Sequence, residues 1–174
     1  MSEYALDPII RLEAGCLNSG AYLWIWHANK IPPHLGLSIN GRYFSLKHNG
    51  KDVGLPADQV IRVIEKKKIA SLFAKIDQNI KHSILEEIFN DYTNATSIGS
   101  TCLTPIAQVF NKSDVQTVFE FLDQLNDEKK LISVSGLYLP EGYKGIPMYG
   151  VDEIRSRLLI LENASFGKHI PSVG

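Results

Sequence analysis

The chain has 174 residues, of which 44% are hydrophobic and 21% are charged, and its formal net charge is −1. This composition is typical of a globular protein with an apolar core, and the near-zero charge gives no electrostatic reason to expect nucleic acid or an anionic membrane as a partner. The two cysteines, Cys16 and Cys102, are too few for a disulfide framework, and no Cys/His spacing resembles a zinc site.

The sequence contains no segment that is typical of a membrane span or of an export signal. The most apolar run, Ala21–Trp26, is far shorter than the roughly 20 residues that a membrane-spanning helix needs. The N-terminal residues lack the basic and apolar regions of a signal peptide. We therefore expect a cytoplasmic protein with no membrane span, folded as a single domain over residues 1–174.

The first predicted elements are strands. Residues 4–20 carry turn signals at Asp7-Pro8 and Asn18-Ser19-Gly20 and predict short strand or loop structure. The run Ala21–Trp26 is rich in aromatic and branched side chains and predicts a buried strand.

Residues 31–46 predict a β-hairpin. Apolar residues alternate with small or polar ones along 34–39, which is the period of a strand with one apolar face. Asn40-Gly41 favours a type I′ turn, because both residues tolerate positive φ. Since Pro32-Pro33 cannot donate ladder hydrogen bonds, His34 is expected where strand pairing begins.

The rest of the chain alternates between helix and strand patterns. These predict, in order, a polar loop at 47–56, a helix at 57–69, a strand at 70–76, a helix at 79–92, a polar linker, a short helix at 104–110, a helix opened by the capping box Ser113-Asp-Val-Gln116, a strand at 131–139, and a last helix at 152–162 followed by a frayed tail.

One pair of residues carries chemistry. Cys102 follows a Ser/Thr/Gly linker and comes just before a helical segment, where exposed N–H groups and the helix dipole favour a thiolate and lower the pKa of the thiol. An imidazole nearby would take the thiol proton, and His34 at a strand end is the candidate. Cys16 is a weaker alternative nucleophile, since no helix pattern follows it.

The order of these motifs resembles the circularly permuted papain-like hydrolases, the group with lecithin-retinol acyltransferase-type enzymes and permuted NlpC-type amidases or peptidases. The resemblance covers residues 20–110, with 111–162 as a helix-strand-helix extension. The matching segments are the aromatic strand Leu23-Trp-Ile-Trp26, the histidine motif His34-Leu-Gly36-Leu-Ser-Ile39, the turn Asn40-Gly41, the strand Ser71–Asp77, the helix Asn79–Tyr92 and the nucleophile segment Thr101-Cys102-Leu103.

The resemblance implies a fold and a site. The fold would be α+β, with a small antiparallel sheet packed against helices, and Cys102 and His34 would be the catalytic dyad. The family often has a third polar member on the returning strand, for which Ser45 is the best-aligned position, and His48 just beyond it is the substitute. The activity implied is that of a cysteine hydrolase or acyltransferase that attacks an amide or ester of a peptide, acyl or lipid-like small substrate. It needs no metal or organic cofactor.

A second hypothesis is a non-catalytic interaction module. Residues 83–139 have the order helix, short helix, helix, strand hairpin of a winged helix-turn-helix. The helix that would read DNA is acidic, so it would repel phosphate, and a protein-contact role is the form of this hypothesis that survives. A papain-like domain that binds a ligand without turnover is a third reading. The oligomeric state is not predicted by any of these patterns.

Overall fold

The computed structural model describes residues 2–169. Its strands are β1 (Glu3–Ala5), β2 (Ile9–Arg11), β3 (Ala21–Trp26), β4 (His34–Ile39), β5 (Arg42–Lys47), β6 (Gly50–Pro56), β7 (Ser71–Ile76), β8 (Leu131–Leu137) and β9 (Gly145–Pro147). Its helices are a short 3-10 helix (Cys16–Asn18), α1 (Ala57–Lys67), α2 (His82–Asn90), α3 (Leu103–Val109), α4 (Val118–Asp127) and α5 (Val151–His169). The α+β class predicted from the sequence is confirmed.

The sheet is larger than the small antiparallel one expected. Within residues 2–169, seven strands pair in the order β2-β8-β7-β3-β4-β5-β6, and β1 pairs with β9 in a separate ladder. All neighbours in the large sheet are antiparallel except β2 and β8, which are parallel. The segment after residue 110 therefore contributes a strand to the same sheet that holds His34.

The predicted hairpin is confirmed at residue level. Strands β4 and β5 pair with Ile39 opposite Arg42, so the turn consists of Asn40 and Gly41. Both turn residues have positive φ, 46° and 81°, as a type I′ turn requires. Tyr43 lies opposite Ser38 and belongs to the same face of the sheet as His34, because side chains alternate along a strand.

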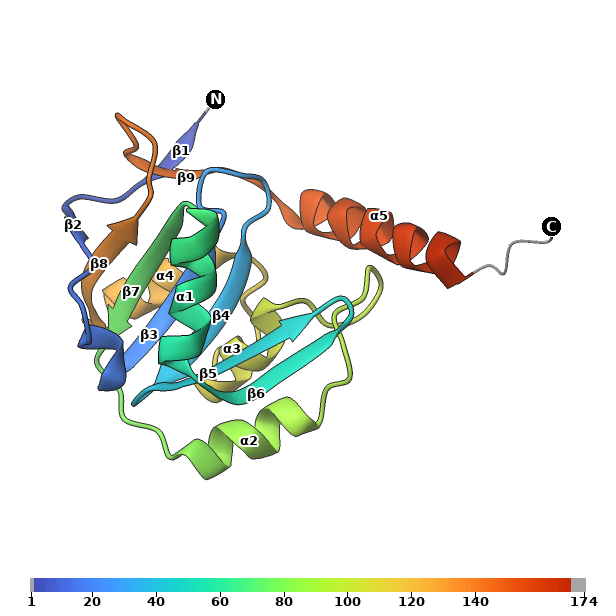
Figure 1. The fold of residues 1–174 in the computed structure, drawn as a ribbon, viewed down its shortest axis with the longest axis horizontal. Helices are drawn as coiled ribbons and strands as arrows, with labels where there is room; N and C mark the ends of the chain where they lie inside the picture. Colours follow the sequence, from blue (N-terminus) through green and yellow to red (C-terminus); the bar gives the residue numbers. More distant parts are fainter. Residues whose placement is uncertain (1, 170–174) are drawn as a thin grey trace.

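Helices cover both faces of the sheet (Figure 1). On one face, α1 packs over a cluster of mainly aromatic side chains from β3, β5 and β7 that includes Trp24, Tyr43 and Phe73. On the other face, α2, α3 and α4 cover a larger core of aliphatic and phenylalanine side chains. Because every second side chain of β4 points to this face, Leu35, Leu37 and Ile39 all join this larger core.

Two local predictions are wrong. Residues 47–56, expected as a loop, contain strand β6, which makes a second hairpin with β5. The helix expected from Ser113 begins only at Val118, where the Thr117 side chain accepts the backbone N–H of Glu120. Thr117-Val-Phe-Glu120 has the sequence pattern of a capping box, but here the Glu120 carboxylate accepts from the Thr117 hydroxyl, at 3.1 Å.

The winged-helix hypothesis for the second half of the chain is also wrong. Its wing would require β8 and β9 to pair with each other. Instead, β8 lies between β7 and β2 in the large sheet, and β9 pairs with β1.

Helix α5 projects from the body (Figure 1). It continues through Asn163 to His169, so the fraying predicted from Asn163 is not found there, and the part of that predicted tail beyond residue 169 lies outside the described residues. Its Leu158 is buried in a small cluster with Leu46 and Ala95. None of the described helices, α5 included, combines the length and apolarity that crossing a membrane demands.

Candidate functional site

Cys102 and His34 line the same cavity. This cavity has a volume of about 870 Å³ and lies where the start of β4, the start of α3 and the side of α5 meet. His48 also lines it, whereas Ser45 and Cys16 do not. Cys16, the alternative nucleophile, lies in the 3-10 helix and packs against the aromatic cluster under α1.

The start of α3 positions Cys102. Two threonines, Thr101 and Thr104, make hydrogen bonds in the first turn. The Thr101 hydroxyl accepts the Leu103 N–H at 3.3 Å, and the Thr101 N–H donates to the Thr104 hydroxyl at 2.9 Å. Cys102 is the residue just before the helix, and Pro105 falls in the first turn, where its missing N–H costs no helical hydrogen bond. The half-buried thiol therefore sits at a fixed place against the sheet.

Backbone N–H groups surround the Cys102 sulfur. Those of Leu35, Cys102 and Leu103 are directed at it and favour the thiolate. Burial acts in the opposite direction and is the larger effect, so the pKa of Cys102 is raised to about 11. The expectation of a lowered thiol pKa is therefore wrong for this structure, because the short helix supplies less stabilisation than removal from water costs.

The sheet fixes the position of His34 at the start of β4, where it lines the same cavity as Cys102. It lies opposite Trp26 at the end of the β3–β4 ladder, with the two ring centroids 6.5 Å apart. The N–H of the next residue, Leu35, is one of those aimed at the Cys102 sulfur. Burial lowers the pKa of His34 to about 4, and the nearby carboxylate of Asp52 opposes that change. At neutral pH both the imidazole and the thiol are therefore uncharged.

Ser45 holds a carboxylate near the histidine. Its hydroxyl donates to Asp52 Oδ2 at 3.0 Å, and Lys47 Nζ donates to Asp52 Oδ1 at 3.2 Å. Among the described side chains no hydrogen bond joins Ser45 to His34. Ser45 therefore acts on the His34 ring only indirectly, by holding Asp52, whose charge raises the pKa of His34.

Asp52 is the site residue that the sequence reasoning missed. It lies opposite Ser45 on β6, a strand that was predicted as a loop. The Asn49-Gly50 dipeptide is a hairpin signal that would have indicated strand β6, but not its register, because the observed turn residues are His48 and Asn49.

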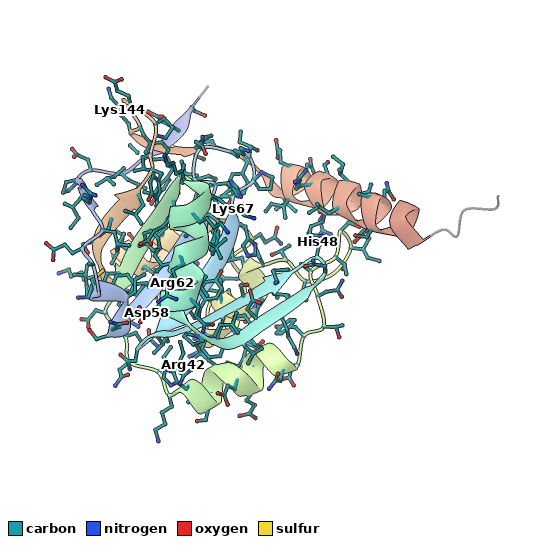
Figure 2. The ribbon with its side chains drawn as sticks, in the orientation of Figure 1. Arg42, His48, Asp58, Arg62, Lys67 and Lys144 are labelled. Atoms are coloured by element: carbon teal, nitrogen blue, oxygen red, sulfur yellow. The ribbon has the colours of Figure 1, made fainter. Side chains whose placement is uncertain are left out.

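His48 lies in the two-residue turn between β5 and β6, since Lys47 pairs with Gly50. Figure 2 shows it at the tip of this hairpin, close to α5. Its carbonyl accepts a hydrogen bond from the Asn94 side chain at 2.9 Å. In the described part of the chain its ring makes no hydrogen bond to His34, and its influence there is electrostatic.

Two buried donors lack partners next to the histidine. Trp26 Nε1 and Tyr43 Oη are fully enclosed and, in the described structure, have no hydrogen-bond partner. The Tyr43 ring lies directly over Gly36, where a Cβ would fall 2.2 Å from its hydroxyl oxygen. Gly36 is thus required for this aromatic wall, because any side chain would displace the Tyr43 ring.

Compared with protein-family models, curated proteins and solved structures, the chain matches none. The chemistry of the site therefore rests on its own residues: a thiol, a neutral imidazole, and a carboxylate held by a hydroxyl and an ammonium. Within residues 2–169, no group of three or more His, Cys, Asp or Glu side chains is placed to hold a metal ion.

Proposed function

We propose that the protein is a cysteine hydrolase or acyltransferase that acts on an amide or ester, with Cys102 as nucleophile and His34 as base. The observation that supports this most directly is that both residues line one cavity and that the N–H beside His34 points at the Cys102 sulfur. The permuted papain-like fold suggested by the sequence is part of the same proposal.

The neutral state of both groups determines the mechanism. An imidazole whose pKa lies near 4 is unprotonated at neutral pH, but it is a weak base toward a thiol whose pKa is about 11, so the thiolate–imidazolium pair is disfavoured before the attack. The Cys102 thiol transfers its proton to His34 as the sulfur attacks the carbonyl carbon, so that no free thiolate accumulates beforehand. The C–S bond forms, and the carbonyl electrons move to an oxyanion that backbone N–H groups near Cys102 stabilise.

The intermediate then collapses. The bond between the carbonyl carbon and the leaving nitrogen or oxygen breaks, and protonated His34 returns its proton to that leaving group. Water, or an acceptor amine or alcohol, next attacks the thioester carbonyl carbon while His34 takes its proton. The C–S bond then breaks, and His34 returns the proton to the sulfur, which regenerates the thiol. Asp52 is a positioning residue in this proposal, because its negative charge favours the protonated imidazole that forms in the transition state.

Acylation by p-nitrophenyl acetate tests the proposal. Release of p-nitrophenol is measured together with the acetylated residue, identified by peptide mass spectrometry, in the full chain and in Cys102→Ala, His34→Gln and Cys16→Ala. Cys16 is the matched control, because it is the other half-buried free thiol of the chain.

We expect the acetyl group on Cys102, its loss in Cys102→Ala, a rate reduced by about 100-fold or more in His34→Gln, and no change in Cys16→Ala. Equal acetylation of Cys16 and Cys102, or a rate that His34→Gln leaves unchanged, would rule out the dyad.

A further inference from the structure

Four cationic side chains line the cavity: Lys47 pairs with Asp52, and the other three are Lys30, Lys67 and Arg157. Lys30 follows β3, Lys67 ends α1, and Arg157 lies on α5, and all three line the cavity wall. None of them takes part in an ion pair among the described residues. No aspartate or glutamate within that part of the chain lines this cavity, although the whole chain carries a net charge of −1.

The loop that carries Lys30 is held in place by hydrogen bonds. The Lys30 N–H donates to the His27 carbonyl at 2.9 Å and closes a turn. Both backbone polar groups of Ala28 are hydrogen-bonded. Its N–H donates to the Ala70 carbonyl at 2.9 Å, and its carbonyl accepts from the Tyr143 hydroxyl at 2.8 Å. The position of Lys30 therefore follows from an anchored backbone.

Helix α5, which carries Arg157, is tied to the loop before α3. Arg155 Nη1 donates to the Ser97 carbonyl at 2.8 Å, and Ser97 donates from its N–H and its hydroxyl to the Glu162 carboxylate at 2.6 and 2.8 Å. These contacts lie on both sides of Arg157 in sequence. They hold this stretch of the helix beside the cavity.

The three charges converge on one neighbour, His27. Burial lowers the pKa of His27, and the positive charges of Lys30, Arg157 and Lys67 lower it further. Each of these cations is thus close enough to the same imidazole to disfavour its protonation. Figure 2 shows Lys67 at the end of α1 that faces α5, while Arg62 lies further back along the helix.

Apolar side chains also line the cavity. They are Trp26, Leu46, Val118, Tyr149, Ile154 and Leu158. A ligand that matches both the cations and these apolar side chains has an apolar body and an anionic group. Guanidinium and ammonium groups bind carboxylate and phosphate oxygens through charge-assisted hydrogen bonds.

We infer that the cavity binds acyl substrates that carry a carboxylate or phosphate group, with Lys30, Lys67 and Arg157 holding the anion and the apolar side chains of the lining holding the acyl body. This assignment of a substrate class rests on the proposed function, whereas anion binding itself does not require turnover.

The test measures binding in the full-length Cys102→Ala chain by isothermal titration calorimetry at low salt. N-acetyl-L-leucine is compared with N-acetyl-L-leucinamide, which has the same body without the negative charge. Phenyl phosphate is compared with phenol, so that the two arms distinguish carboxylate from phosphate. Arg157→Gln and Lys67→Gln are introduced in this background, with Arg62→Gln as the control cation of α1 outside the cavity wall.

We expect the anion of at least one pair to bind about tenfold more tightly than its neutral partner, with most of that preference lost in Arg157→Gln or Lys67→Gln and kept in Arg62→Gln. Equal binding of the charged and neutral members of both pairs would overturn the inference, even if p-nitrophenyl acetate acylates Cys102. Selective anion binding without acylation of Cys102 would leave the anion site standing, but it would refute the proposed function and with it the assignment of acyl substrates.

Discussion

Acidification is expected to destabilise the fold through His34. Burial lowers the pKa of this imidazole from its usual 6.5 to about 4, with smaller contributions from the charges of Lys47, His27 and His48 and an opposing one from Asp52. The unfolded chain therefore binds a proton at a higher pH than the folded chain does. The free energy of unfolding falls as the pH drops from about 6.5 to about 4, and this contribution is constant below that range.

The size of the effect follows from the two pKa values. At about 1.4 kcal/mol for each pKa unit, His34 removes about 3 kcal/mol of stability at or below pH 4. Urea unfolding, followed by the fluorescence of Trp24 and Trp26, is measured at several pH values in the parent chain and in His34→Gln. The parent should lose about 3 kcal/mol more than the variant between pH 7 and pH 4. Parallel pH profiles for the two proteins would refute the buried, neutral state assigned to His34.

Substitutions at three further positions test the packing and the hydrogen bonds of the fold. Gly36→Ala is expected to cost about 1–3 kcal/mol, because the new methyl group displaces the buried Tyr43 ring; an unchanged urea midpoint would contradict this. Lys51→Met removes an ammonium that donates to three carbonyls at the end of α2. Thermal unfolding should show that the free energy of unfolding falls by about 1–3 kcal/mol. No fall would mean that water replaces the ammonium and would contradict this expectation. Thr117→Ala should cost about 1 kcal/mol and Thr117→Ser much less in urea unfolding, whereas equal losses would exclude the cap.

The sequence predicts an element correctly where the residues that determine its structure all lie within one short segment. The β4–β5 hairpin follows from alternation and from two residues that accept positive φ, and α1 follows from its amphipathic pattern. Strand β6 was missed because its sequence, Gly50–Pro56, is polar and contains two glycines. Its place in the sheet comes from pairing with β5, a contact that its own pattern does not specify.

The candidate site likewise has features that the sequence predicts and features that depend on tertiary packing. The residue types of Cys102 and His34, and their positions at the starts of a helix and a strand, could be read from the sequence, because backbone patterns locate such ends. Their protonation states could not be read, because desolvation depends on the segments that pack around each group. Burial makes the thiol and the imidazole neutral, and pairing of β6 with β5 brings Asp52 to Ser45 and near His34.

The cationic cluster depends most completely on tertiary structure. Lys30, Lys67 and Arg157 are far apart in the chain, and in the sequence each is an ordinary surface charge. Only the packing of α5 beside the cavity and the end of α1 brings their charges together around His27. The sequence by itself determined the α+β class, the hairpin and the positions of Cys102 and His34 at the starts of a helix and a strand, because each has a local cause. The cavity, its charge and the protonation of its residues were decided by contacts between distant segments.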